Sequence, residues 1–153
     1  MDSADLAQLV AQLLAAIHTI SGYPLPDAGP AVRLASLSEM QAMVCRGPCQ
    51  VRGFYTRENG VVLNETLDLA HDTTARSVLL HELVHYVQQL NGKFEKLPDR
   101  CDRWFAREYE AYEIQNAYLR TQGSALRFDT ESVRHLCRKE EPGDAGFDPR
   151  SPG

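Results

Sequence analysis

The chain has 153 residues, 43% hydrophobic and 24% charged, which is the composition of one ordinary globular domain. The net charge of −5 and the lack of a basic stripe argue against a nucleic-acid-binding surface. No apolar run approaches a membrane span, and Asp2 and Asp5 open the chain without the basic and apolar blocks of a signal peptide. We therefore expect a single domain over residues 1–139 and a flexible tail over 140–153.

The cysteines are even in number: Cys45, Cys49, Cys101 and Cys137. They lack the paired C-x-x-C units of a zinc finger, so a four-cysteine metal site is not expected. Two disulfides in an exported protein fit this count, while four buried thiols in a cytosolic protein remain the alternative. We favour the pairs Cys45–Cys49 and Cys101–Cys137, and with them a periplasmic or secreted location over a cytoplasmic one.

The N-terminal half alternates between helical and strand patterns. Apolar residues at helical spacing predict a packing helix over residues 3–21, and a connection rich in proline and glycine follows. A strand is expected over 31–37, followed by a short helix capped by Ser38. Strands over 50–57 and 61–64 flank Glu58-Asn59-Gly60, which is typical of a hairpin with a type I′ turn, whose two central residues need positive φ.

The second strand of this hairpin is the last element expected before the helix over residues 73–91. If it lies at the edge of the sheet, its unpaired backbone groups can bind an extended peptide by strand addition. The candidate residues for this role are Val61, Val62, Leu63 and Asn64. An ordinary solvated edge is the alternative.

The segment from Thr73 to Asn91 reads as a helix that contains His81-Glu82-Leu83-Val84-His85, the form H-E-x-x-H. Residues four apart share a helix face, so His81 and His85 can present two imidazole nitrogens to one zinc ion. Glu82 then reaches a water bound to that ion. The motif also arises by chance, but here it lies in register with the apolar stripe, where unpartnered histidines would be costly to bury.

A second long helix, expected over residues 99–122, offers three candidates for the third ligand: Glu108, Glu110 and Glu113. Glu108 lies in the middle of the apolar face of this helix, Glu110 lies among arginines near the solvated side, and Glu113 is intermediate. A carboxylate in a buried face needs a cation or a strong donor. We therefore predict Glu108 as the third zinc ligand, with Glu110 in reserve. A short helix over 128–139 is expected to follow.

The motif and the following glutamate together resemble a known group. His81-Glu82-x-x-His85 followed by Glu108-Tyr109-Glu110-Ala111 resembles the gluzincins, zinc metallopeptidases whose third ligand is a glutamate on a following helix. The same run is similar to the E-x-x-A-D signature of HtpX-type peptidases, which implies the ligand role for Glu108. His81 to Gln89 also resembles the motif helix of small, little-characterised bacterial metallopeptidases. The resemblance covers about residues 61–119.

One position departs from this signature, because Tyr112 stands where E-x-x-A-D has its aspartate. In that family the aspartate orients a histidine ligand, so Asp68, Asn64 or a backbone carbonyl is expected to take over the role here. Tyr112 is either a packed aromatic residue or a donor that stabilises the oxyanion of the transition state. His71 and His135 are further candidates for a role in the site, but each is more typical of a surface or capping histidine.

These observations predict an α+β, minimal zincin-like domain. A small antiparallel or mixed sheet with a hairpin would pack on the motif helix, accompanied by the ligand helix and an N-terminal helix. The expected function is that of a zinc metallopeptidase, a hydrolase with one Zn²⁺, in which Glu82 assists the attack of zinc-bound water on a peptide or protein substrate. The alternative is a non-catalytic zinc-bound module or a peptide-binding domain that retains the site. The oligomeric state stays open.

Overall fold

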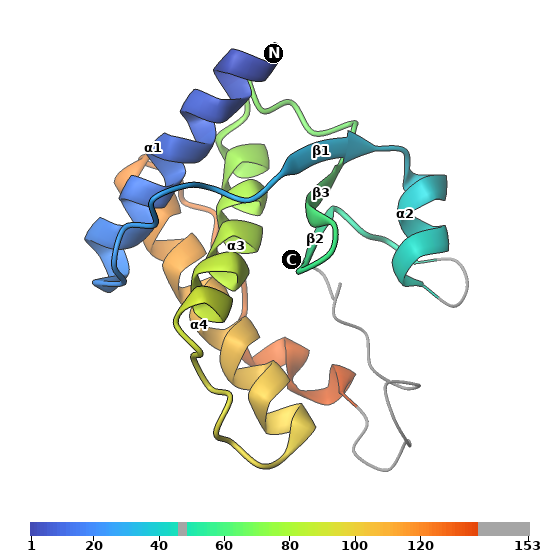
Figure 1. Ribbon diagram of the computed structural model, residues 1–153, viewed down its shortest axis with the longest axis vertical. Helices are drawn as coiled ribbons and strands as arrows, with labels where there is room; N and C mark the ends of the chain where they lie inside the picture. The colour runs from blue at the N-terminus through green and yellow to red at the C-terminus, as the bar shows by residue number, and fades with distance from the viewer. Residues whose placement is uncertain (46–48, 138–153) are drawn as a thin grey trace.

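The computed structural model describes residues 1–45 and 49–137, apart from the side chain of His135, so the expected tail over 140–153 lies outside the described residues. The fold is α+β, as predicted, with an N-terminal helix and a small mixed sheet (Figure 1). Its elements in chain order are α1 (Ser3–Ser21), β1 (Val32–Ala35), α2 (Leu37–Val44), β2 (Gly53–Thr56), β3 (Gly60–Asn64), α3 (Thr73–Leu90), α4 (Arg100–Thr121) and the 3₁₀ helix η1 (Glu131–Leu136).

Polar side chains define where the helices begin. Asp72 and Asp99 cap α3 and α4 by accepting hydrogen bonds from backbone N–H groups of the first turn. The cap of α2 is Ser36 and not Ser38, because Ser36 has an extended backbone and accepts the N–H of Glu39 at 3.1 Å. Gly92 and Gly123, each one residue beyond the C-cap of α3 and α4, adopt positive φ, for which helix ends favour glycine.

The sheet has the order β1-β3-β2, with β1 parallel and β2 antiparallel to β3. The prediction of an edge strand at Val61, Val62, Leu63 and Asn64 is therefore wrong, because β3 is the central strand and is paired on both sides. Val61 and Leu63 face the core around α3, and Val62 faces α2 on the opposite side of the sheet. An unbroken apolar run is typical of a strand that is covered on both faces. The strand at the edge beside α3 is β2.

The hairpin between β2 and β3 has a longer turn than the sequence suggested. Thr56 pairs with Gly60, so three residues form the loop, and only Gly60, at φ 67°, has positive φ. The predicted type I′ turn is wrong for this reason. Thr56 Oγ1 accepts the N–H of Asn59 at 3.0 Å and holds the loop. A Cβ at residue 60 would lie 2.3 Å from the carbonyl oxygen of Ala31, so the approach of β1 requires glycine there.

The motif helix α3 lies at the centre of the molecule, between the sheet and the other two long helices (Figure 1). One core cluster joins α1, β3, α3 and α4, and includes Leu13, Ile17, Leu63, Leu80 and Val84. A second cluster lies between the sheet and α2, and a third, built on Trp104, Tyr112 and Val133, joins α4 to η1. As a result α3 is buried along most of its length, and its polar side chains must find partners inside the protein.

The N-terminal helix α1 is long and apolar enough, with a mean hydropathy of 1.2, to cross a membrane by length and composition alone. This differs from the expectation that no segment approaches such a span. Core helices of soluble proteins and signal sequences meet the same criterion. In this structure Leu9, Leu13 and Ile17 are buried in the core shared with α3 and α4.

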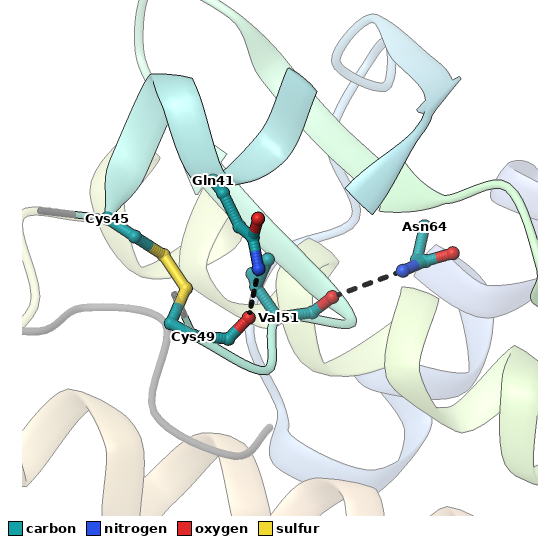
Figure 2. Close-up of a disulfide and its surroundings, with 5 residues drawn as sticks. All are labelled: Gln41, Cys45, Cys49, Val51 and Asn64. Carbon is teal, nitrogen blue, oxygen red and sulfur yellow. Dashed lines mark hydrogen bonds between the residues drawn. A yellow bond between two sulfur atoms is a disulfide. The ribbon is translucent and has the colours of Figure 1, made fainter. Parts of the chain in front are cut away.

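Both predicted disulfides are present, Cys45–Cys49 and Cys101–Cys137. The first joins the end of α2 to the segment before β2, where Gln41 donates to the carbonyl of Cys49 at 2.8 Å (Figure 2). The second ties the start of α4 to the end of η1. Disulfides persist in oxidising compartments, so the pair indicates an extracellular or otherwise oxidising environment.

Candidate metal centre

Three side chains from α3 and α4 converge in the protein interior: His81, His85 and Glu108. Their ligand atoms all lie within 4.8 Å of one another. Nε2 of His81 lies 3.2 Å from Nε2 of His85 and 3.3 Å from Oε1 of Glu108, and Nε2 of His85 lies 2.5 Å from Oε2 of the same carboxylate. His81 and Glu108 are 1% and 3% exposed. The structure therefore brings together the three residues predicted as metal ligands.

The protonation state of His81 follows from a chain of hydrogen bonds. Ser77 Oγ donates to the carbonyl of Thr74 at 2.7 Å, so it accepts from Nε2 of Gln115 at 3.0 Å. This fixes the amide of Gln115 with its oxygen 3.0 Å from Nδ1 of His81. Nδ1 therefore carries the proton, and Nε2 presents a lone pair to the converging group.

His85 is fixed in the same way by Gln88. Nε2 of Gln88 donates to the carbonyl of Arg107 at 3.0 Å and to Glu110 at 3.1 Å, both of which only accept. The amide oxygen is thus turned towards Nδ1 of His85, at 2.9 Å. Nδ1 of His85 donates to it, and its Nε2 also presents a lone pair. Two imidazole lone pairs and a carboxylate now face one another, an arrangement that only a cation or added protons can satisfy.

The pKa values of His85 and Glu108 also indicate that a positive charge is favoured between these side chains. Burial alone would lower the pKa of His85, but the carboxylate of Glu108 outweighs it and raises that pKa to about 9. Burial would raise the pKa of Glu108, yet its electrostatic interactions and hydrogen bonds with His85 and His81 outweigh burial and hold that pKa at about 2. Without a metal, a proton on His85 takes the place of the cation. Two imidazoles and one carboxylate form a donor set of the kind that binds catalytic zinc, so the residues present fit such an ion.

Glu82 lies beside this group but does not belong to it. It is 4% exposed, and its pKa is raised because burial disfavours the charged carboxylate more than the neighbouring histidines favour it. Gly53 of β2 allows the sheet to pack here, since a Cβ would lie 2.8 Å from Leu63 Cδ2 and 3.3 Å from Glu82 Cγ. The motif alone gave no sign of this glycine contact.

A cleft of about 260 Å³ opens next to the converging residues. Glu82, His85 and Glu108 line it from the helices, and Tyr55 and Thr56 line it from β2. Two of the three candidate metal ligands, His85 and Glu108, therefore line one cleft together with Glu82 and the edge strand of the sheet.

The other candidate residues whose side chains the structure describes lie outside the group. Glu110, expected near arginines and solvent, instead accepts hydrogen bonds from the Tyr23 hydroxyl and from Gln88. Glu113 is exposed, and His71 pairs with Asp68 at 3.2 Å on the surface. The side chain of His135 lies outside the described part of the chain.

Tyr112 packs its ring against His81, with 4.5 Å between the ring centroids, and against Phe128. Its hydroxyl is buried without a hydrogen-bond partner in the described structure, and burial raises its pKa, as do the charges of Glu108 and Glu82. Tyr112 is 1% exposed and does not line the cleft. Its role as an oxyanion donor stays a prediction.

The residues that orient the histidines were missed from the sequence. Neither Asp68 nor Asn64 performs this role, because Asp68 pairs with His71 and Asn64 contacts Val51 and Thr66. Gln88 and Gln115 perform it instead. Their positions offered a signal, because each glutamine falls on the apolar face of its helix and is fully buried. A buried glutamine needs partners for both ends of its amide.

The sequence profile of a family described as a domain of unknown function (DUF6647) matches residues 2–139. No curated protein and no solved structure matches the chain.

Proposed function

Because the chain belongs to the DUF6647 family, whose description assigns no function, its activity must be argued from the site, and we propose that it is a zinc-dependent metallopeptidase. The observation that carries the proposal is the convergence of the lone pairs of His81 and His85 on the Glu108 carboxylate, with Glu82 beside them in the same cleft. Structural zinc sites close with four protein ligands, whereas catalytic sites have three and leave a position for water or substrate.

A bound Zn²⁺ supplies Lewis-acid polarisation of the scissile carbonyl and lowers the pKa of water towards neutrality. Glu82 supplies the proton transfer. Its buried carboxylate, with its raised pKa, is a better proton acceptor than an exposed glutamate and a usable donor in the following step. It takes the proton from the attacking water and delivers it to the leaving amine, so that each turnover returns Glu82 to its starting state.

The peptide is proposed to bind along β2. This strand lies at the edge of the sheet, and Tyr55 and Thr56 line the cleft that contains Glu82 and His85. An extended substrate can pair with the free backbone groups of such an edge. The two disulfides fit a protein that is exported and acts in the periplasm or outside the cell.

A metal-bound peptide-binding module without catalysis is the second candidate. The small cleft favours it, because about 260 Å³ is below the roughly 300 Å³ at which sites that enclose a ligand begin. Such a module needs the metal ligands but gains nothing from a buried glutamate that is not a ligand. The state and function of Glu82 therefore separate the two candidates.

Two substitutions test the proposal. Glu82→Gln keeps the side-chain shape and removes the proton acceptor, so zinc content and melting temperature should remain while peptide cleavage falls by roughly 10²–10⁴-fold. Glu108→Gln should lose most of the bound zinc on dialysis, and Glu113→Gln, an exposed site on the same helix, is its matched control. Cleavage should be measured with an unbiased peptide library.

Equal cleavage by wild type and Glu82→Gln would contradict the proposed mechanism. Equal zinc retention by the Glu108 and Glu113 variants would contradict the ligand assignment. Wild-type protein that holds one zinc ion and cleaves nothing would favour the binding module.

A further inference from the structure

Arg107 lines the cleft immediately before the ligand Glu108 on α4, and its side chain is only partly exposed. Its guanidinium makes no hydrogen bond and no ion pair with any residue that the structure describes; only its backbone carbonyl is used, by Gln88. The side chain is partly desolvated, and the charges that act on it are those of Arg103, Glu108 and Glu95. The carboxylates of Glu95 and Glu108 act on it through space, but neither forms an ion pair with it, so its donors are available to a ligand in the cleft.

Two more cations line the same cleft, Arg57 from the hairpin and Lys93 from the turn after α3. The amide of Gln89 satisfies both of its neighbours when its nitrogen donates to the Tyr55 hydroxyl and its oxygen faces Arg57. In this orientation Arg57 donates to the side-chain oxygen of Gln89 at 2.9 Å. The ammonium of Lys93 lies 5.2 Å from the ring centroid of Phe94. Neither cation forms an ion pair with a carboxylate in the described parts of the chain.

The lining of the cleft has as many arginine and lysine side chains as carboxylates, three of each, whereas the whole chain is acidic. The chain carries a net charge of −5. In the cleft, a divalent cation would match Glu82 and Glu108, after which Arg57, Lys93 and Arg107 face the single carboxylate of Glu95. With that cation bound, the lining would carry an excess of positive charge, which attracts an anionic ligand even in a protein of negative net charge.

We propose that Arg107, supported by Arg57 and Lys93, binds a carboxylate of the peptide substrate. This inference rests on the proposed peptidase function, since it assigns the substrate class of the same cleft. The planar guanidinium presents a fork of donors that matches a carboxylate in two parallel hydrogen bonds. The carboxylate belongs either to an aspartate or glutamate side chain or to the C-terminus of the peptide.

The test measures binding with the chemistry removed. Zinc-loaded Glu82→Gln protein is titrated, by fluorescence anisotropy, against three pools of short labelled peptides. One pool has both ends blocked and contains glutamate, the second is identical with glutamine for each glutamate, and the third is the glutamine pool with a free C-terminus. The glutamate pool or the free C-terminus pool should bind roughly ten-fold tighter than the blocked glutamine pool, and the preference should weaken at high salt.

Arg107→Gln in this background should abolish the preference, while Arg120→Gln, which removes the same charge from an exposed site on the same helix, should preserve it. Arg107→Lys should retain part of it, because the charge remains and the fork is lost. Equal affinity for all three pools, or equal loss of preference in the Arg107→Gln and Arg120→Gln variants, would overturn the inference. Wild type that fails to cleave peptides would count against the peptidase function alone, because this measurement does not depend on turnover.

Discussion

The side-chain oxygen of Gln115 on α4 lies 3.0 Å from Nδ1 of His81 on α3, 34 positions earlier in the chain. A neutral amide thus orients a histidine where the resembled peptidases use an aspartate. Gln88 does the same for His85. An amide fixes the tautomer of the imidazole without adding negative charge, so Glu108 is the only carboxylate among the three candidate ligands and the two groups that orient the histidines.

Gln115→Leu should weaken zinc binding by roughly 10–100-fold, the usual effect of losing a partner that orients a metal ligand. The substitution keeps the approximate volume of the side chain but leaves Nδ1 of His81 without an acceptor. Zinc affinity measured by competition with a chromophoric chelator is the readout. Gln115→Glu retains an acceptor for His81 and should bind zinc more tightly than Gln115→Leu; an equal loss in both would reduce Gln115 to a packing role.

Metal removal should reveal the coupling between His85 and Glu108. In the metal-free protein the pKa of His85 is raised from 6.5 to about 9, because Glu108 outweighs the effect of burial, and Glu108 stays ionised with a pKa of about 2. A folded-state pKa above the unfolded value stabilises the fold fully below pH 6.5, and this contribution is lost as the pH rises through about 9. The melting temperature of chelator-treated protein should therefore fall across that interval. A His85→Gln variant should lose this part of the pH dependence, and an unchanged slope would contradict the coupling.

The two disulfides should differ in their contribution to the free energy of unfolding. Cys101–Cys137 closes a loop with a sequence separation of 36, and Cys45–Cys49 one with a separation of 4. Chain entropy predicts losses of about 4 kcal/mol and about 2 kcal/mol when each pair is replaced by serine. Urea unfolding of the two double variants checks the order; a larger loss for the Cys45 and Cys49 variant would show that the long loop is already restrained in the unfolded chain.

Local features of the sequence determined much of this protein. The helical spacing of apolar residues around His81 and His85 predicted the residue range of α3, because this spacing and the capping of a helix depend on residues that are close in the sequence. The same argument placed Glu108 in the buried face of α4, where a lone carboxylate needs a cation. The disulfide pairs followed from the even count and from which elements each pair would join.

Tertiary structure decided what local patterns leave open. The run from Val61 to Leu63 fits a strand at an edge or at the centre, and only the approach of β1 on its second side made it central. The partners of Gln88, Gln115 and Glu110 come from distant parts of the chain, so no spacing rule identifies them. The three arginine and lysine side chains that line the cleft, likewise, come from separate parts of the chain: Arg57, Lys93 and Arg107. Pairing and polar contacts between such elements are set by how the whole chain packs, because each buried polar group must find its partner wherever the fold brings one within reach.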